Sequence, residues 1–279
     1  MDLATKKELM KTACKVRMGI IEAVFNAKSG HPGGSLSIAD LLTYLYFKEM
    51  KVDPKNPKWE DRDRLVLSKA HTAPGLYSVL AQKGYFPEEE LKGLRQVGRM
   101  LQGHPDMKTI PGIDMSSGSL GQGISVACGM ALSGKISNKD YRVFTILGDG
   151  EIQEGQVWEA AMFAGFRKLD NLIAIVDNNG LQIDGKIDDV NSPYPIDEKF
   201  KAFNWHVINL DDAHDFDKIE AAFKEAESVT DKPVVIVQKS VKGKGVSFME
   251  NNAAWHGSAP NAEQYEQAMS ELKAAYEAI

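Results

Sequence analysis

The stretch Tyr141-Arg-Val-Phe-Thr-Ile-Leu147 runs directly into Gly148-Asp149-Gly150, and the stretch Leu172-Ile-Ala-Ile-Val176 runs into Asp177-Asn178-Asn179-Gly180. Both stretches are short, apolar and rich in β-branched residues, as is typical of strands that are buried on both faces. The residues between them, 156–168, have the apolar spacing of a helix. A strand, a helix and a second strand predict a parallel sheet that is covered by helices.

Further short apolar segments extend this pattern in both directions. Strands are predicted at 65–67, 205–210 and 234–237. Helices are predicted at 9–24, 38–50, 73–82, 88–97, 123–132, 216–228 and 262–279, with a glycine-rich loop at 31–37. The fold class is therefore α/β, a parallel sheet flanked by helices. We expect residues 1–279 to form a single domain with a helical N-terminal portion and a C-terminal helix.

The composition is that of an ordinary soluble protein. The 279 residues carry a net charge of −6, which argues against a general nucleic-acid or acidic-membrane binder, because such a protein needs an excess of Lys and Arg. The two cysteines, Cys14 and Cys128, exclude a disulfide scaffold and fit a reducing compartment. There is no apolar run of signal-peptide or membrane-spanning type. We therefore expect a cytoplasmic protein without nucleic-acid or membrane partners.

Oxygen-bearing side chains follow the two strongest strands. Asp149 stands between two glycines, and Asn179 follows the next strand along the chain. The carboxyl ends of parallel strands meet at one edge of the sheet, where ligands of open α/β sheets bind. A carboxylate, an amide oxygen and a main-chain carbonyl suit Mg²⁺, which shares its remaining positions with phosphate oxygens. Either turn taken alone is more simply explained as a loop, but the pair together favours a metal site.

The histidines form a second group. His31, His71, His104 and His256 each lie in a segment rich in glycine or alanine rather than on an apolar helical stripe. A lone histidine is more often structural, but four in loops that the fold could bring to one rim favour proton transfer near neutral pH. The remaining two, His206 and His214, match no motif and are predicted to be surface or core residues.

Several segments together resemble transketolase. A Gly-Asp-Gly turn followed, after a helix and a strand, by Asn-Asn is similar to the thiamine diphosphate fingerprint. More specific motifs occur in transketolase order across nearly the whole chain: Ser29-Gly-His-Pro-Gly-Gly-Ser-Leu-Ser37, Leu67-Ser-Lys-Ala-His71, Gln102-Gly-His-Pro-Asp106, Gly118-Ser-Leu-Gly-Gln-Gly123, Gly148-Asp-Gly-Glu-Ile-Gln-Glu-Gly155, Lys242-Gly-Lys-Gly-Val-Ser247 and Trp255-His-Gly257. The resemblance implies a thiamine diphosphate-binding fold of the diphosphate-binding type.

The resemblance also implies a metal and cofactor site. Asp149 and Asn179 would ligate Mg²⁺ by their side chains and Leu181 by its carbonyl, with Ca²⁺ or Mn²⁺ able to substitute. Gly150 would let the diphosphate pack closely. The other residues implied to lie against the cofactor are Gly118, Leu120, Glu154, Ile183, His71 and His256. For Ile183 an ordinary core position is equally compatible with the sequence.

The implied reaction is transfer of a two-carbon ketol unit from a ketose phosphate to an aldose phosphate, as in the pentose phosphate pathway. His31, His104 and His256 would face substrate hydroxyls, and His71 would contact the cofactor and the reacting carbonyl. Glu154 and Glu159 would meet the partner across a subunit interface, or would simply lie on a solvated helix face. Lys242 and Lys244 either approach a phosphate or belong to a surface loop.

Single-chain transketolases are more than twice as long, and their pyrimidine-binding domain carries the activating glutamate. The chain therefore resembles the N-terminal subunit of a split transketolase, which is active only when a C-terminal subunit joins it and is expected to form an α2β2 heterotetramer. Three alternatives stay open. The ketose could be unusual, such as a sulfonated or branched sugar. The chain could be the alpha subunit of a 2-oxo-acid dehydrogenase, or a non-catalytic homologue that kept the fold.

Overall fold

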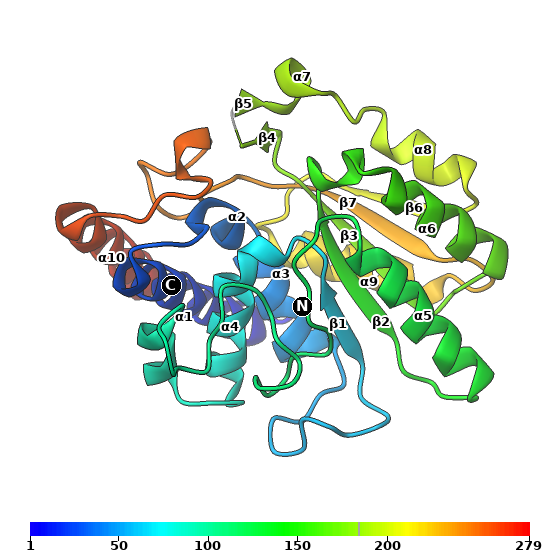
Figure 1. Cartoon of the computed structure of the whole chain (residues 1–279), viewed down its shortest axis with the longest axis horizontal. Coiled ribbons are helices and arrows are strands. Elements are labelled where there is room, and N and C mark those ends of the chain that lie inside the picture. The colour runs from blue at the N-terminus through cyan, green and yellow to red at the C-terminus, as the bar shows by residue number, and fades with distance from the viewer. Residues whose placement is uncertain (184) are drawn as a thin grey trace.

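The computed structural model describes residues 1–183 and 185–279. A five-stranded sheet lies at its centre, with strand order β1-β2-β3-β7-β6 and every neighbouring pair parallel (Figure 1). Its strands are β1 (Arg64–Leu67), β2 (Val143–Gly148), β3 (Leu172–Asn178), β6 (His206–Leu210) and β7 (Val234–Lys239). The predicted α/β class and all five predicted strands are confirmed.

Helices cover both faces of this sheet (Figure 1). One face carries α1 (Leu3–Ala27), α2 (Pro32–Ser37), α3 (Ala39–Tyr44), α4 (Ala73–Lys83), α9 (Phe216–Ser228) and α10 (Ala262–Glu277). The other face carries α5 (Gly123–Ile136), α6 (Gly155–Arg167) and α8 (Ile196–Ala202). Short elements complete the described chain: α7 (Ile187–Val190), the antiparallel pair β4 (Leu181–Gln182) and β5 (Gly185–Lys186), a π-helical turn (Leu45–Glu49), and 3₁₀ helices at Ala70–Thr72, Glu88–Gly93, Glu151–Gln153 and Ala253–Trp255.

The sheet explains why the strand sequences are apolar throughout. Successive side chains of a strand point to opposite faces. Ile173 and Ile175 of β3 belong to the core beneath α1, α3, α4 and α9, whereas Leu172, Ala174 and Val176 belong to the core beneath α5, α6 and α8. All five are at most 3% exposed, so this part of β3 is buried on both faces, and polar side chains, Asp177 and Asn178, come only at its end.

The register of the central strands positions the site. Gly148 at the end of β2 pairs with Asp177 of β3, and Asn178 of β3 pairs with Lys239 of β7. The loops that follow these three strands therefore leave the sheet at the same edge and at the same level. Asp149 and Asn179 are brought together in this way.

Helix α1 is longer than the predicted span 9–24, because it begins with a cap that the apolar pattern does not reveal. The Asp2 carboxylate accepts a hydrogen bond from the Thr5 backbone N–H at 2.9 Å. Such a cap satisfies one of the unpaired donors of the first helical turn. The helix ends where Lys28 adopts a left-handed conformation with φ of 50°. The added first turn lies outside the apolar stripe that predicted the helix.

Two predictions of local structure are wrong. The predicted helix 88–97 is a 3₁₀ helix that stops at Gly93, after which Leu94 is extended and Arg95 is left-handed with φ of 58°. The predicted glycine-rich loop 31–37 contains helix α2, which begins at Pro32, a residue favoured in the first helical turn because it lacks an N–H. The segment 88–93 packs against α1 and α4, where tertiary packing outweighs local preference.

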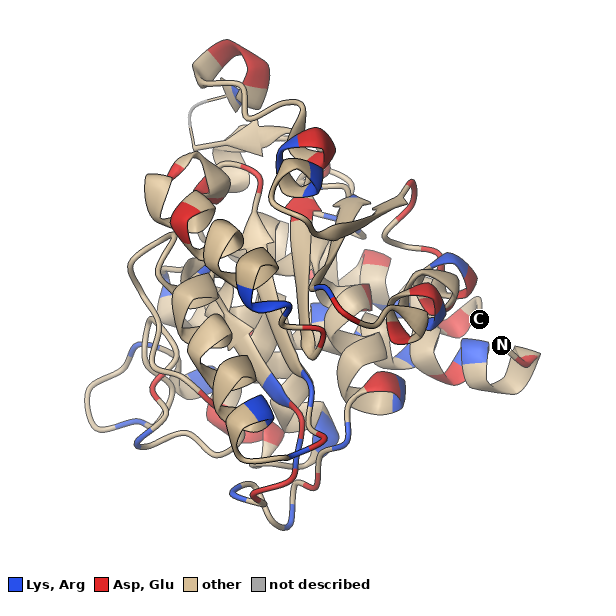
Figure 2. Cartoon of the chain, turned by 90° about the vertical axis from the view of Figure 1, so that its right-hand side faces the viewer, with Lys and Arg blue, Asp and Glu red and all other residues tan. Residues whose placement is uncertain are grey.

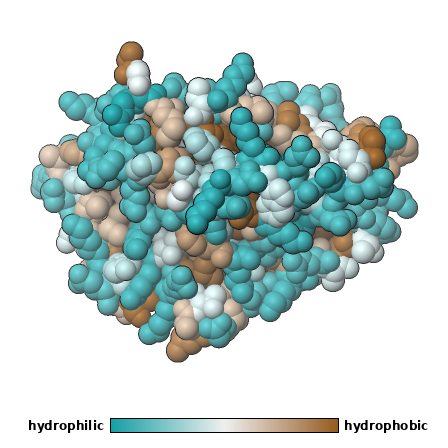
Figure 3. Space-filling model, turned by 90° about the horizontal axis from the view of Figure 1, so that it is seen from below, coloured by the Kyte–Doolittle hydropathy of each residue, from teal (hydrophilic) through white to brown (hydrophobic). Residues whose placement is uncertain are grey.

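The surface shows no broad apolar band in the view from below, where hydrophilic side chains predominate and apolar ones are scattered (Figure 3). Within the described residues, no helix combines the length and apolar character needed to cross a bilayer.

Candidate active site

A cavity of about 800 Å³ opens beyond the carboxyl ends of β2 and β3. Every side chain or glycine that the sequence placed in the metal, cofactor or catalytic groups lines it: His31, His71, His104, Gly118, Leu120, Asp149, Gly150, Glu154, Asn179, Leu181, Ile183 and His256. These residues come from loops that are far apart in the sequence. The topology therefore brings all twelve to one place.

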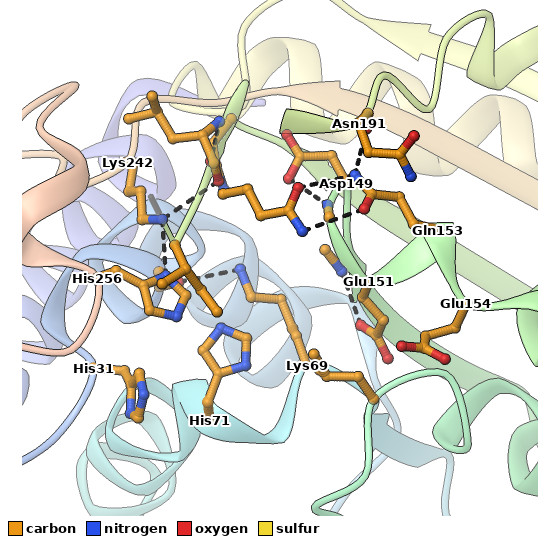
Figure 4. A pocket seen from close by; sticks show the side chains of 18 of the residues that line it. His31, Lys69, His71, Asp149, Glu151, Gln153, Glu154, Asn191, Lys242 and His256 are labelled. Atoms are coloured by element: carbon orange, nitrogen blue, oxygen red, sulfur yellow. Dashed lines mark hydrogen bonds between the residues drawn. The ribbon is translucent and has the colours of Figure 1, made fainter. Parts of the chain in front are cut away.

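Asp149 lies on the sheet side of the cavity (Figure 4) and is 2% exposed. Its Oδ1 accepts a hydrogen bond from the Gly150 N–H at 2.9 Å, and its Oδ2 accepts one from the Gly180 N–H at 2.6 Å. Burial, together with the nearby charge of Asp177, raises the pKa of Asp149 to about 6. A carboxylate in this setting is stabilised by a cation, because its charge is otherwise buried with little compensation.

Two neutral oxygens accompany this carboxylate. The Asn179 amide donates from Nδ2 to Asp177 Oδ2 at 3.1 Å, which fixes the orientation of the amide and leaves Oδ1 as its acceptor end. The Leu181 carbonyl faces Lys242, whose Nζ lies 3.4 Å away. Among the described residues, no cluster of three or more His, Cys, Asp or Glu side chains has metal-binding geometry. One carboxylate and two neutral oxygens are donors of the kind that suit Mg²⁺ bound jointly with phosphate oxygens, so these three residues could hold such a metal.

Three histidines form a compact group across the cavity from Asp149 (Figure 4). The ring centroids of His31, His71 and His256 are 5.2 to 5.3 Å apart in every pair. Burial, reinforced by neighbouring cationic groups, lowers the pKa of His31 to about 4 and that of His256 to about 3, and it lowers the pKa of His71 well below its usual range. All three rings are therefore neutral near pH 7 and able to donate or accept a proton.

Among the described residues, His31 has an unpaired ring nitrogen, and His104, the fourth histidine of the cavity, lies outside the three-ring group. His31 Nδ1 is buried and has no hydrogen-bond partner within the described part of the chain. Buried polar atoms are rarely left unpaired, so this atom points to a ligand or water in the cavity. His104 stands apart from the three-ring group, beside Gly118, where a Cβ atom would lie 4.0 Å from the His104 ring. Partial burial and the charge of Arg95 lower its pKa.

Polar residues that the sequence did not single out lie on the cavity lining or directly behind it. Lys69 and Asp177 form a buried ion pair, with Nζ to Oδ2 at 2.6 Å, directly behind Asn179. Glu151 accepts hydrogen bonds from the Gly148 N–H at 3.0 Å and the Gly121 N–H at 2.9 Å. Further lining residues are Gln153, Gln182 and Asn191. Lys69 and Glu151 stand inside two of the quoted motifs, and that was the only signal that could have found them.

The structure resolves several open alternatives. Lys242 is 2% exposed and lines the cavity, whereas Lys244 is partly exposed and pairs with Glu250 at 3.4 Å. Burial, together with the charge of Lys69, lowers the pKa of Lys242 to about 8. Ile183 is 60% exposed at the cavity, so the core alternative is excluded.

The two glutamates of α6 and the two unassigned histidines also differ in position. Glu154 lines the cavity, but Glu159 is exposed on α6 and does not. His206 is partly exposed and pairs with Glu225 at 2.8 Å. His214 is largely buried and contacts Asp40 at 2.7 Å, so the prediction of a surface or core residue holds for both.

Comparison with known proteins identifies this architecture. Residues 8–277 match the family described as transketolase, thiamine diphosphate binding domain. The chain therefore belongs to the transketolase family and forms its thiamine diphosphate-binding part. This match favours the transketolase interpretation over a 2-oxo-acid dehydrogenase subunit.

Individual relatives show which transketolases this chain is similar to. The 6-deoxy-6-sulfo-D-fructose transketolase subunit SqwG of Clostridium sp. (strain MSTE9) is 47% identical, covering 95% of this chain and 96% of its own length. An apulose-4-phosphate transketolase subunit from Phocaeicola vulgatus is 42% identical, covering 92% of this chain and 91% of its own length. The solved transketolase of Campylobacter jejuni superimposes with a TM-score of 0.90 at 33% identity, over 98% of this chain and 43% of that one.

Both of these relatives match along nearly their whole length, and both are subunits by name. The prediction of an N-terminal, thiamine diphosphate-binding subunit of a transketolase is confirmed. The protein is thus a transferase subunit, and a second subunit is implied.

Proposed function

We propose that this chain, as one diphosphate-binding domain of residues 1–279, joins a C-terminal subunit to transfer a two-carbon ketol unit from a ketose to an aldose phosphate. One observation carries the proposal: oxygen donors for a metal and a group of neutral histidines face each other across the same cavity. Ketol transfer needs a diphosphate cofactor at one wall and proton donors and acceptors at the other. A cytoplasmic location stays a prediction.

For the metal, we propose that the Asp149 carboxylate, Asn179 Oδ1 and the Leu181 carbonyl hold Mg²⁺, with Ca²⁺ or Mn²⁺ able to replace it. The buried charge of Asp149 and the fixed amide of Asn179 support this set. Gly150 would allow close approach of the diphosphate, since it has no side chain to exclude it. When bound, thiamine diphosphate supplies the chemistry that breaks and forms the carbon–carbon bond beside a carbonyl.

For the reaction, we propose that His31, His104 and His256 bind substrate hydroxyls, and that His71 lies against the cofactor and the reacting carbonyl. The pKa values of all four are lowered, mainly by burial, so the rings can move protons without first losing one to reach the neutral form. His31 Nδ1 is buried without a hydrogen-bond partner among the described residues, and a substrate hydroxyl or a water would satisfy it.

Four residues at the cavity edge are proposed to contact the cofactor. Gly118 and Leu120 lie on the loop before α5, and Glu154 and Ile183 also line the cavity. Leu120 is 39% exposed and Ile183 is 60% exposed. Large apolar side chains that line a cavity while remaining exposed are suited to contact a bound ring system.

We propose that the C-terminal subunit, carrying the pyrimidine-binding domain, covers the exposed face of α5 and α6. Few charged side chains lie on these two helices (Figure 2): α5 carries Lys135, and α6 carries Glu159 and Arg167. The helices also carry exposed apolar side chains: Val126, Met162, Phe163 and Phe166. The face is continuous with the cavity, because Gly121 of the lining loop packs against Glu154 at the start of α6. An α2β2 heterotetramer would give two such interfaces. An apolar surface beside a polar cavity is typical of a protein contact.

Phe166→Asp is expected to weaken binding of the C-terminal subunit by about tenfold or more, because Phe166 is 78% exposed and central apolar residues dominate interface energies. Binding is measured by calorimetry with the purified partner. Leu3→Asp, a 70% exposed position at the start of α1, is the matched control and should bind normally. Equal affinity for both variants would contradict the proposed interface.

The donor sugar is tested directly. The ordinary donor is a ketose phosphate such as xylulose 5-phosphate, with ribose 5-phosphate as acceptor. The names of the two subunit relatives support an alternative, an unusual ketose such as a sulfonated or branched sugar. We expect ketol transfer with Mg²⁺ and thiamine diphosphate only when both subunits are mixed. Xylulose 5-phosphate, 6-deoxy-6-sulfofructose and apulose 4-phosphate are compared by kcat/KM. Activity of this chain alone, or none with any donor, would overturn the proposal.

A further inference from the structure

The loop of residues 241–245, which follows β7, carries Lys242 into the cavity. Lys242 Nζ lies 3.0 Å from His256 Nδ1, and the two side chains meet beside His71 (Figure 4). Lys242 is 2% exposed. Its place in the cavity therefore depends on how firmly the 241–245 loop is held.

The 241–245 loop is held from the side away from the cavity. The Val241 N–H donates to His214 Nε2 at 3.0 Å, immediately before Lys242. The Arg17 Nε–H donates to the Lys244 carbonyl at 3.0 Å, two residues after Lys242. Both anchors converge on Asp40, whose Oδ2 lies 2.7 Å from His214 Nδ1 and whose Oδ1 lies 3.0 Å from Arg17 Nη1. Arg17 of α1, Asp40 of α3 and His214 of the loop before α9 thus form a buried cluster that anchors the 241–245 loop on both sides of Lys242.

The hydrogen bonds determine the state of the His214 ring. A backbone N–H can only donate, so His214 Nε2 must accept and carries no proton. The ring proton is therefore on Nδ1, where it is donated to the Asp40 carboxylate. Protonation would place an N–H on Nε2 directly opposite the Val241 N–H, and two facing donors cannot form a hydrogen bond. The anchor at Val241 exists only while His214 is neutral.

Charges and hydrogen bonds also hold Asp40 in its ionised form, as acceptor for both anchors. Burial by itself raises the pKa of Asp40, but Arg17 and the hydrogen bond from His214 outweigh it and bring that pKa to about 2. The Asp40 charge is then balanced by the paired Arg17 guanidinium. The charged or titratable groups that face this cluster are Arg17 and Cys14 on α1, Asp40 on α3, Asp212 beside His214, and Lys244 and Glu250 after the 241–245 loop.

We propose that His214 is a positioning residue that holds the 241–245 loop, and with it Lys242, against the cavity only while its ring is neutral. The inference rests on the proposed function in one respect, since it makes Lys242 and His256 parts of a working active site. The hydrogen bonds that anchor the loop do not depend on that function. Acid is therefore expected to release Lys242 through a residue that does not line the cavity.

Amide hydrogen exchange of the full chain tests whether His214 holds the 241–245 loop, and it needs no activity assay. Loss of one hydrogen bond should lower the protection of the Val241 amide by about tenfold, so His214→Ala is expected to do this at every pH. In the unaltered chain the same loss should develop as the pH is lowered, because a protonated ring can no longer accept the hydrogen bond from the Val241 N–H. His214→Gln keeps an acceptor for Val241 and a donor for Asp40 but cannot be protonated. It should retain protection throughout, as rescue by a conservative variant.

Three results would overturn the proposal. One is unchanged protection of the Val241 amide in His214→Ala. The second is equal pH dependence in the unaltered chain and in His214→Gln, a comparison that still decides if His214→Ala does not fold. The third, measured with the C-terminal subunit, is a kcat/KM of His214→Ala equal to that of the unaltered chain. His206→Gln is the control, because His206 is partly exposed and pairs with Glu225. Loss of ketol transfer in every sample, with the exchange pattern intact, would overturn the proposed function alone.

Discussion

Asp149→Ala should abolish Mg²⁺-dependent binding of thiamine diphosphate. Asp149 is the only carboxylate in the proposed donor set, and Asn179 Oδ1 and the Leu181 carbonyl are neutral. Removal of outer partners of a metal site already lowers affinity by about 10- to 100-fold, so loss of the charged ligand should lower it by about 100-fold or more. The affinity is measured by calorimetry on the complex with its C-terminal subunit, with and without Mg²⁺.

Two further variants distinguish the loss of the metal ligand from the loosening of the turn at Asp149. Asp149 also accepts hydrogen bonds from Gly150 and Gly180, so Asp149→Ala loosens the turn as well as removing the ligand. Asp149→Asn keeps the size of the side chain and removes its charge, and it should lose nearly as much affinity. Asp189→Ala, an exposed carboxylate on α7, should bind normally. Unchanged cofactor affinity in Asp149→Ala would mean that the metal is held elsewhere.

His104→Ala should lower kcat/KM by about 100-fold or more while the affinity for thiamine diphosphate changes little, because a positioned acid–base group contributes about 10²- to 10⁴-fold. His104 is suited to this test since it stands apart from the packed group of His31, His71 and His256, so its removal leaves those rings in place. Both quantities are measured on the same preparation of the two-subunit complex.

The comparison of the two losses decides the role of His104. A residue that binds substrate affects turnover far more than cofactor binding. His206→Ala, at a partly exposed position outside the cavity, should leave both unchanged. If His104→Ala lost cofactor affinity and turnover in the same proportion, the histidine would be structural.

The parts of the site that follow strand ends could be predicted from the sequence. An apolar strand fixes where the chain leaves the sheet. Asp149 and Asn179 each follow such a strand, so the sequence predicts that they meet at the edge of the sheet. The histidines were found because the motifs around them resemble transketolase. That resemblance also brought in Gly118, Leu120 and Ile183, for which periodicity gave no signal.

The missed parts depend on contacts between distant segments. Lys69 and Asp177 are both buried, and their ion pair together with hydrogen bonds from Ser37 and Ser240 to Asp177 compensates the buried charges. Their sequence separation leaves no periodic pattern to detect. The same holds for His214, whose partners Asp40 and Val241 lie on other elements. The wrong helix at 88–97 has a similar cause, since Arg95 takes a left-handed conformation that its sequence does not favour.

The most direct test of the central claim is an experimental structure of the chain with its C-terminal subunit, Mg²⁺ and thiamine diphosphate. We expect the metal within about 2.0 to 2.1 Å of an Asp149 carboxylate oxygen, Asn179 Oδ1 and the Leu181 carbonyl, with its remaining positions taken by diphosphate oxygens and water. The histidines should face the reactive end of the cofactor. A metal bound to other residues, or a diphosphate outside this cavity, would contradict the account.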